Sequence, residues 1–464
     1  MQINRRRALQ VLGTLGGLGL AGRYALLPPS RSRKLDAPRE LAIRFYESLS
    51  AEDRKRICVD YDDPIRQFHN KGVRGGGLWV NPMSLGWEQR SIVNDLLHAG
   101  LSEAGQQRVP NEFFTRWPGV HSMNVLLCGN PKTQPYQLIL TGPHLNLRVG
   151  GRSREGAAFG GPLVYGDQRG NSVQGIPGNL YRFQFQTAHR LFQSLRPAER
   201  QAALQKDSPI QTDIQLQGSQ GSFAGVELAR ALAESRAIAR EVIDGILSTY
   251  PAEDVRFAQQ CLERNGGAER LYLSYYEDSE VDRSGQFQNF RLEGPAAVLY
   301  FRGYPHVHAF INVGMDGDAP LSVGELLGEN PTPLEGVKVK RLFETAMREQ
   351  AGADLGYYEL EGVAGRLRKG SIRTGDIYAL ESWQDSVAVV EIKGSNLSAN
   401  LVEELRNRGA ELNRRHVYTV ATTGYVASEL AAEKLGKVES SQRRGLVRDA
   451  TMTYLRKRGF SSVG

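Results

Sequence analysis

The chain has 464 residues, 40% of them hydrophobic and 23% charged, which is the composition of a folded protein too long for one ordinary core. Its formal net charge is +7, but residues 1–40 contain eight basic and two acidic side chains, so the rest of the chain carries only +1. The basic balance is therefore weak evidence for nucleic-acid binding. Three widely spaced cysteines exclude a disulfide framework, although one bridge is compatible with an oxidising compartment.

The first 38 residues have the layout of an export signal and a linker. Arg5, Arg6 and Arg7 precede a short, Gly-rich apolar stretch over residues 8–22, which is a poor transmembrane span. The arginines resemble the twin-arginine signal, which sends folded proteins across a bacterial inner membrane. We therefore expect an exported, periplasmic or cell-envelope protein with no membrane span beyond this segment. An uncleaved anchor and a non-secreted basic N-terminus are the alternatives.

Helical patterns follow the signal. The stretch RELAIRFYESLSAEDRKRICV predicts one or two helices, with Ser50 at a helix start. In MSLGWEQRSIVNDLLHAGLSEAGQQRV, Ile92, Leu96 and Leu97 form an apolar stripe, and Ser102 is placed as the cap of a further helix.

The hydrophobic period then changes. PYQLILTGPHLNLRVGG alternates like a strand, and the Gly-rich residues 150–175 predict a long irregular loop or a set of tight turns. Helices are expected over 180–204 and 225–250. Strands follow in RLYLSYYED, NFRLEGPAAVLYFRG and HVHAFINV. Because the elements come in blocks, the pattern favours an α+β domain with mixed helices and sheet over residues 39–328.

A second domain is predicted after a short linker. LLGENPTPLEG has the Pro and Gly content of a linker, placed at residues 329–336. Beyond it the patterns alternate: a helix in VKRLFETAMREQAG, strands in SIRTGDIYAL and SVAVVEIKG, a helix in LSANLVEELRNRG and a strand in HVYTVATTGY. This order predicts a smaller α/β domain over residues 337–464.

Two histidines interrupt an apolar strand in RGYPHVHAFINVG. Val307 and Ala309 share one face of the strand, so His306 and His308 lie on the other face. Two imidazoles at this spacing can bind one ion, and His144 from another strand would be a third ligand. Three histidines suit zinc or copper with an open coordination position. The alternative is that these are partly buried structural histidines hydrogen-bonded to the Gly-rich loop.

Residues from about 40 to 330 resemble the bacterial family called domain of unknown function 3500. The resemblance rests on the order of five blocks: MSLGWEQRSIVNDLLHAGLSEAG, QLILTGPHLNLRV, FGGPLVYG, FRLEGPAAVLYF and PHVHAF. Members commonly carry a double His before Leu in the second block and His-x-His in the fifth. Here Pro143 takes the place of the first His, and His144 takes that of the second. The resemblance strengthens the metal interpretation and implies no particular activity.

Residues from about 337 to 428 resemble the C-terminal domain of bacterial 5'-nucleotidases. The match runs from FETAMREQAGADLGYYELEG to SNL, aligns without a gap over 370–394, and includes HVYTVATTGYVAS. The family turn Gly-Gly-Ile-Arg is here Glu361 to Ala364, so alanine replaces the arginine expected to bind substrate. The family's Pro-Phe-x-Asn is here residues 382–385. Trp383 keeps an aromatic ring that can stack on a base, and it is the expected substrate-binding residue.

The metallophosphatase domain of that family, which binds paired metals through Asp-x-His and Gly-Asn-His-Asp motifs, has no counterpart in the pattern of residues 40–330. Full 5'-nucleotidase activity is therefore not expected. The first hypothesis is an exported protein that binds one transition metal ion, as a metal-dependent hydrolase or oxidase. The second is a non-catalytic nucleotide- or ligand-binding module, with residual nucleotide hydrolysis as a further alternative. The expected partner is a small molecule, not a nucleic-acid polymer.

Overall fold

The structure is a computed structural model, and it describes residues 37–67, 84–114, 123–133, 135–142, 144–150, 156–167, 180–211, 213–280, 285–319, 321–381, 383–407, 409–433, 435, 437–438 and 444–460. The chain forms two compact units: the N-terminal unit spans Asp36–Gly324, and the C-terminal unit contains Glu325–Gly464. The predicted export signal lies outside the described residues, apart from its last two positions. Within the described residues, no helix is long and apolar enough to cross a membrane.

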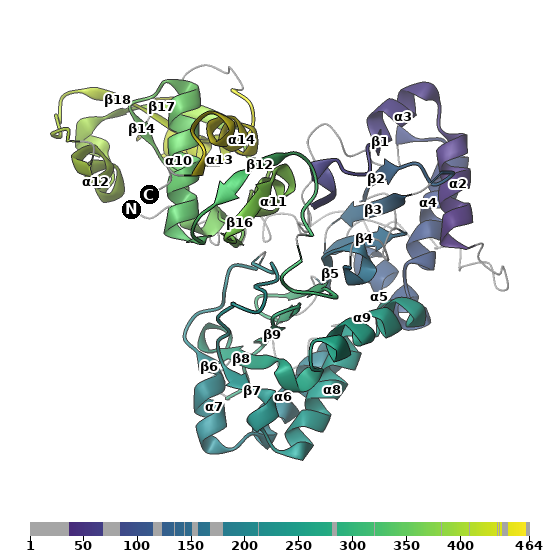
Figure 1. The fold of residues 1–464 in the computed structure, drawn as a ribbon. Helices are drawn as coiled ribbons and strands as arrows, with labels where there is room; N and C mark the ends of the chain where they lie inside the picture. The colour runs from purple at the N-terminus through teal and green to yellow at the C-terminus, as the bar shows by residue number, and fades with distance from the viewer. Residues whose placement is uncertain are drawn as a thin grey trace. The chain divides into compact units, whose positions relative to one another are not determined.

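An eleven-stranded sheet forms the centre of the N-terminal unit (Figure 1). Its strands lie in the order β1-β2-β3-β4-β5-β11-β10-β9-β8-β6, and β7 also pairs with β8. The pairs β1–β2 and β6–β8 are parallel, whereas β4–β5 and β5–β11 are antiparallel. The strands are β1 Cys58–Val59, β2 Asn124–Gly129, β3 Tyr136–Gly142, β4 Leu145–Val149, β5 Leu163–Asp167, β6 Leu204–Gln205, β7 Val226–Glu227, β8 Tyr272–Tyr276, β9 Asn289–Gly294, β10 Ala297–Arg302 and β11 Val307–Val313.

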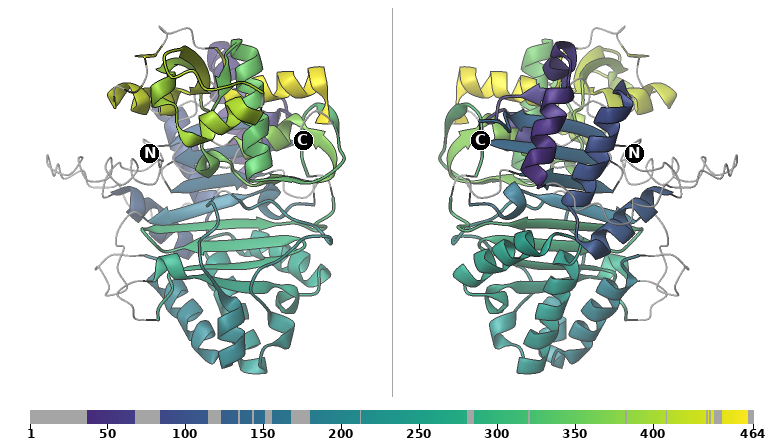
Figure 2. Two further views of the ribbon diagram at one scale, coloured as in Figure 1. Left: turned by 90° about the vertical axis from the view of Figure 1, so that its left-hand side faces the viewer. Right: turned by 90° about the vertical axis from the view of Figure 1, so that its right-hand side faces the viewer.

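The helices of this unit cover one face of the sheet (Figure 2). Both predicted helix starts are confirmed: the Ser50 hydroxyl accepts a hydrogen bond from the Asp53 backbone N–H at 3.0 Å, and Ser102 accepts one from Gly105 at 2.9 Å. The helices are α2 Pro38–Ser48, α3 Ala51–Ile57, α4 Trp87–Ala99, α5 Glu103–Phe114, α6 Arg182–Ser194, α7 Pro197–Ala203, α8 Ala233–Leu247 and α9 Ala252–Arg264.

The two faces of β11 belong to different apolar clusters. Val307 and Ala309 face the main core, which lies between the sheet and the helices. Phe310, on the opposite face, packs in a smaller cluster with Val164 and Ile214. The alternation predicted for this strand is therefore confirmed, and His308 shares the face of Phe310. We call this side of the sheet the second face.

The Gly-rich stretch is not all loop. Residues 163–167, predicted as part of a long irregular loop, form β5 in the middle of the sheet, paired with β4 and β11. The strand is buried on both faces, so its apolar residues do not alternate with polar ones, and glycines flank it on either side. Because of these two features, a strand of five residues gives no period-two signal in the sequence.

The three cysteines are free thiols, so the bridge considered from the sequence does not form. In the pairing of β1 with β2, Val59 lies opposite Cys128, which puts Cys58 and Cys128 on opposite faces of the sheet. Burial raises the pKa of the Cys128 thiol to about 12, which keeps it protonated and unreactive at neutral pH.

The C-terminal unit combines a four-stranded sheet, in the order β14-β18-β17-β19, with two short strand pairs, β12–β16 and β13–β15. Helix α10 packs against α14 and β18. The strands are β12 Leu326–Asn330, β13 Leu334–Glu335, β14 Leu355–Gly356, β15 Arg366–Leu367, β16 Gly370–Arg373, β17 Val387–Lys393, β18 Val417–Thr423 and β19 Lys437–Val438. The helices are α10 Val337–Ala351, α11 Thr374–Leu380, α12 Ala399–Asn407, α13 Gly424–Ala432 and α14 Val447–Arg458.

Two local predictions for this unit are wrong. Residues 329–336 are not a linker, because β12 pairs with β16 and β13 pairs with β15 across them. Pro331 and Pro333 sit in the connection between these two short strands, where proline is well tolerated. SIRTGDIYAL is a strand only as far as Arg373, after which Asp376 accepts a hydrogen bond from the Arg373 backbone N–H at 2.7 Å and α11 begins.

Candidate metal centre

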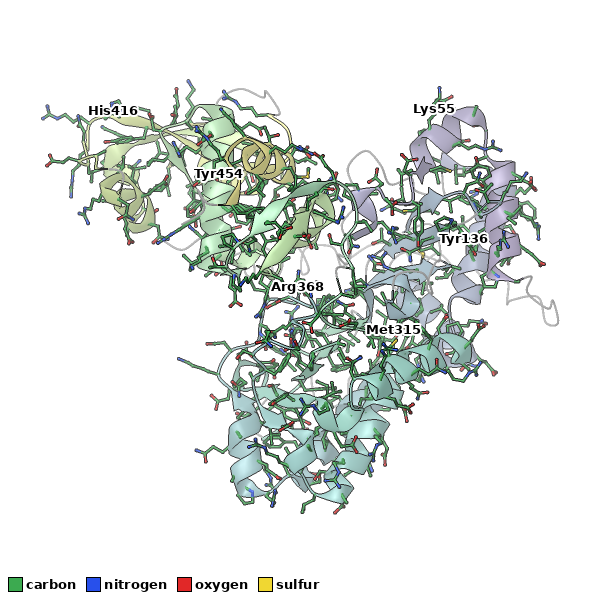
Figure 3. The ribbon with its side chains drawn as sticks, viewed as in Figure 1. Lys55, Tyr136, Met315, Arg368, His416 and Tyr454 are labelled. Atoms are coloured by element: carbon green, nitrogen blue, oxygen red, sulfur yellow. The ribbon has the colours of Figure 1, made fainter. Side chains whose placement is uncertain are left out.

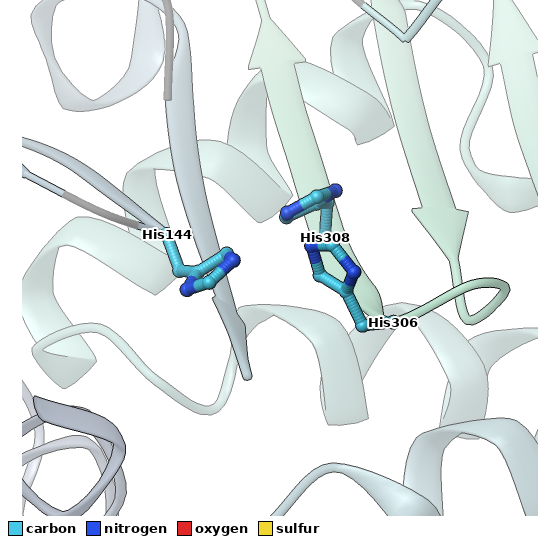
Figure 4. A group of neighbouring side chains, drawn as sticks. All are labelled: His144, His306 and His308. Carbon is cyan, nitrogen blue, oxygen red and sulfur yellow. The ribbon is translucent and has the colours of Figure 1, made fainter. Parts of the chain in front are cut away.

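Three histidine side chains meet on the second face of the sheet (Figure 4). His144, His306 and His308 each offer a ring nitrogen, and these three atoms lie within 4.8 Å of one another. The ring centroids of His306 and His308 are 4.4 Å apart, and that of His144 is 5.0 Å from each. A tetrahedral ion with bonds of about 2.0–2.1 Å holds its nitrogens roughly 3.3 Å apart. To bind one ion in this geometry, the nitrogens must approach one another by at most about 1.5 Å.

The strand register brings these residues together. His144 immediately precedes β4, whose first residue pairs with Tyr165 of β5. His308 of β11 pairs with Gly166, the next residue of β5. The start of β4, the end of β5 and the start of β11 therefore meet at one place in the sheet, although they lie about 20 and 140 residues apart in the chain.

Gly166 provides the space that the rings occupy. A Cβ atom at this position would lie 2.2 Å from the Val307 carbonyl oxygen, 3.0 Å from the His308 ring and 3.2 Å from the His144 Cβ. Cβ atoms do not approach backbone oxygen so closely, so any other residue would force β5 and β11 apart. A glycine between the histidine-bearing segments is thus required by the packing of the site.

His144 has a strained backbone. Its φ is +58°, in the left-handed region that residues with a Cβ rarely adopt, although His enters it more readily than most. Such a conformation persists only where the surrounding structure imposes it, and it is commonest at functional sites. Here it sets the start of the His144 side chain beside Gly166 and the histidine pair.

The electrostatic surroundings of the site differ between its members. His308 is fully buried, and His144 and His306 are partly buried. Arg302 Nη1 lies 3.5 Å from His308 Nδ1 and also donates to the Gln211 side-chain oxygen at 2.8 Å. Arginine only donates, so this contact favours the tautomer with the lone pair on Nδ1 and the proton on Nε2. An ion on His308 would break this contact by either route, because it would take Nδ1 itself or take Nε2 and leave the ring proton on Nδ1.

The remaining described histidines do not join this group. His98 and His189 lie in α4 and α6, where burial lowers the pKa of each ring and favours its neutral form. His416 is exposed just before β18 and, like Lys55 at the end of α3, projects from its unit (Figure 3). Among the described residues, His144, His306 and His308 are the one group of three His, Cys, Asp or Glu side chains arranged to hold an ion.

Trp383, the other predicted site residue, lies in the C-terminal unit between α11 and β17. It is partly buried, and its backbone N–H donates to Glu381 Oε1 at 3.2 Å. Ala364, at the position where an arginine was expected, is fully buried, and its N–H donates to the Leu380 carbonyl at 2.9 Å. Arg448 of α14 is also buried, with its guanidinium 4.1 Å from the centre of the Tyr378 ring.

Sequence reasoning did not find four residues of these sites. Gly166 and Arg302 are defined by strand pairing, and Arg448 reaches its place only through the packing of α14 on α11. Asn146 of β4 is different: it pairs with Val164 of β5, which pairs with Phe310 of β11, so it lies on the second face, and its segment alternates like a strand. Its position on the same face was therefore available from periodicity.

Comparison with known families agrees with both resemblances. A family model described as "Protein of unknown function (DUF3500)" matches residues 32–311, well over half of the chain. The chain belongs to this family. The matched region contains all three histidines of the candidate metal centre. A second model, the C-terminal domain of 5'-nucleotidase, matches residues 328–404. That type of domain is compatible with a small-molecule ligand. A search of curated proteins found no match.

Three solved structures are similar to parts of the chain. A 5'-nucleotidase precursor from Thermus thermophilus is 13% identical, with a TM-score of 0.25, and the match covers 40% of this chain and 51% of that one. A putative 5'-nucleotidase from Staphylococcus aureus, in complex with alpha-ketoglutarate, is 10% identical, with a TM-score of 0.22 and coverages of 39% and 49%. The NAD nucleotidase of Haemophilus influenzae is 8% identical, with a TM-score of 0.23 and coverages of 41% and 55%. The chain spans about half the length of each.

Proposed function

We propose that the N-terminal unit binds one transition metal ion, zinc or copper, through His144, His306 and His308. The observation that carries the proposal is the convergence of three imidazole nitrogens within 4.8 Å, one from the start of β4 and two from the start of β11. Such a group is costly in the absence of an ion, because cationic imidazoles at this distance repel one another and burial penalises the charged form of each ring. An ion bound by all three nitrogens would require the neutral form of each ring, which removes the repulsion.

The chemistry of this ligand set is that of an open site. Structural zinc sites in proteins use four protein ligands, whereas three protein ligands leave a position for water or substrate. A bound ion would use that position to activate water for hydrolysis or to react with dioxygen. His308 is fully buried, whereas His144 and His306 are partly exposed, so solvent reaches two of the three residues. We therefore propose a metal-dependent hydrolase or oxidase acting on a small molecule.

Elemental analysis tests the proposal. The full chain is purified from an export-competent host without chelators, and its metal content is compared with that of a His306→Ala/His308→Ala variant. His416→Ala is the matched control, because His416 is exposed and lies outside the group. We expect about one zinc or copper ion per chain in the wild type and the control, and none in the double variant. Equal metal content in all three proteins would overturn the proposal.

A second function is proposed for the C-terminal unit, namely binding of a nucleotide-like or other aromatic ligand at Trp383 without turnover. The supporting observation is a buried cationic group in the same part of the unit: Arg448 acts electrostatically on Glu381, and the Oε1 atom of Glu381 accepts a hydrogen bond from the backbone N–H of Trp383. A ring and a guanidinium together suit a ligand with an aromatic and an anionic part. The fluorescence of the wild type minus that of Trp383→Phe, titrated with nucleosides and nucleotides, should change on binding. An unchanged difference spectrum would count against it.

A further inference from the structure

Asn146 lies beside the histidine group on the same face of the sheet. It pairs with Val164 of β5, and Val164 pairs with Phe310 of β11. Residues that are paired across antiparallel strands point to the same face, so Asn146 shares the second face with Phe310. His308 is on that face too, two residues before Phe310. The row of side chains that contains Asn146 is therefore the row next to the histidines.

The side chain of Asn146 is buried without a partner. Its exposed fraction is 0%, and within the described residues neither its amide oxygen nor its amide nitrogen makes a hydrogen bond. Asn312, on the same face of β11, shows the ordinary arrangement, since its amide nitrogen donates to the Ile214 carbonyl at 2.8 Å. Burying a polar group without a partner is costly, so native proteins rarely retain one that has no use.

We propose that Asn146 is the recognition group for the small molecule that binds at the histidine site. This inference rests on the proposed metal function. A side-chain amide presents an acceptor and a donor side by side, and its complement is a ligand group with a donor beside an acceptor, as in a carboxamide. The ligand class is therefore a small molecule that offers oxygen to the ion and an amide-like group to Asn146. Ligand binding supplies the partners that the buried amide lacks.

The competing explanation is structural, with a buried water completing the hydrogen bonds of Asn146. Substitution by leucine, which has nearly the same shape, separates the two explanations. If Asn146 serves the ligand, Asn146→Leu removes a buried polar group with no protein partner, and the melting temperature rises or stays unchanged. Asn312→Leu is the matched control, and its melting temperature should fall because the Ile214 carbonyl loses its donor.

The binding test uses two probes of the same shape. Oxamate and pyruvate both present a carboxylate and a carbonyl to an ion, but oxamate carries an amide NH₂ where pyruvate has a methyl group. Copper-loaded wild type and copper-loaded Asn146→Leu are titrated with each probe, and the visible absorption of the copper is followed. The quantity compared is the affinity for oxamate divided by the affinity for pyruvate. We expect this ratio to be about tenfold larger in the wild type than in Asn146→Leu, which is the effect of one hydrogen bond. Metal content should be equal in both proteins.

Each other outcome counts against one specific claim. An equal oxamate-to-pyruvate ratio in the two proteins, or a fall in melting temperature like that of Asn312→Leu, would overturn the role of Asn146 and leave the metal site standing. Loss of copper from Asn146→Leu would show that the amide supports the ion itself, which also overturns a recognition role. Failure of the wild type to take up metal would overturn the proposed function, and this inference with it.

Discussion

Glu381 gives a sharp prediction for the C-terminal unit. The residue lies at the end of α11 with an exposed fraction of 0%, and its Oε1 atom accepts hydrogen bonds from the backbone N–H groups of Trp383 at 3.2 Å and Asp385 at 3.4 Å. Burial, together with the nearby Asp385 carboxylate, raises the pKa of Glu381 from 4.5 to about 7, against the opposing influence of Arg448.

The sign and size of the effect follow from this pKa. A carboxyl group whose pKa is higher in the folded than in the unfolded state binds its proton more tightly when folded, so stability falls as pH rises from about 4.5 to about 7. Each pKa unit corresponds to about 1.4 kcal/mol, so the ionised group costs on the order of 3 kcal/mol above pH 7. Glu381→Gln mimics the protonated form and keeps the acceptor oxygen. It should stabilise the unit at pH 8 by on the order of 3 kcal/mol and change little at pH 4.5.

Hydrogen exchange of peptides from α14 and β17, measured in the full chain at both pH values, reports this local stability. In the wild type, protection corrected for intrinsic rate should fall by about two orders of magnitude between pH 4.5 and pH 8, and in Glu381→Gln it should not. Asp385→Asn lowers the pKa of Glu381 and should give an intermediate fall, whereas Arg448→Met raises it and should enlarge the fall. The same pH dependence in the wild type and Glu381→Gln would refute the reasoning.

Further predictions concern the histidine site and export. Gly166→Ala should cost about 1–3 kcal/mol of stability and lose metal, because the new Cβ meets the Val307 carbonyl oxygen at 2.2 Å. The control is Gly245→Ala in α8, where the new Cβ would make only ordinary contacts, and it should gain about 0.5–1 kcal/mol of stability. Glycine readily adopts the φ of +58° found at His144, so the free energy of unfolding of His144→Gly should lie within about 1 kcal/mol of the wild-type value. The variant should nevertheless bind metal at least tenfold more weakly in a competition titration. Unchanged affinity would remove His144 from the ligand set. Replacing Arg5 and Arg6 by lysine should leave the protein in the cytoplasmic fraction of a bacterial host, and unchanged fractionation would contradict twin-arginine export.

Residue patterns were informative where one periodicity dominated. The alternation in β11 was enough to separate the core face from the histidine face, and Ser50 and Ser102 marked helix starts because capping depends on local hydrogen bonds. The pairing of β5 with its neighbours was not visible, because that strand is short, doubly buried and flanked by glycine. Without β5, the position of His144 beside the other two histidines could only be a hypothesis.

Composition misled where proline and glycine serve tight connections inside a unit. The segment at 329–336 has the composition of a linker but joins two strands that pair within the C-terminal unit. Contacts between residues of distant elements could not be predicted from local sequence patterns either. The proximity of Arg448 to Glu381 depends on how α14 packs on α11, and no short-range pattern encodes that packing.

The metal content of the purified full chain tests the central claim most directly. We expect close to one zinc or copper ion per chain, present in His416→Ala and absent from the His306→Ala/His308→Ala variant. A wild-type protein that contains no transition metal, and takes up none when zinc or copper is added, would contradict the account and leave the three histidines as structural residues of the second face.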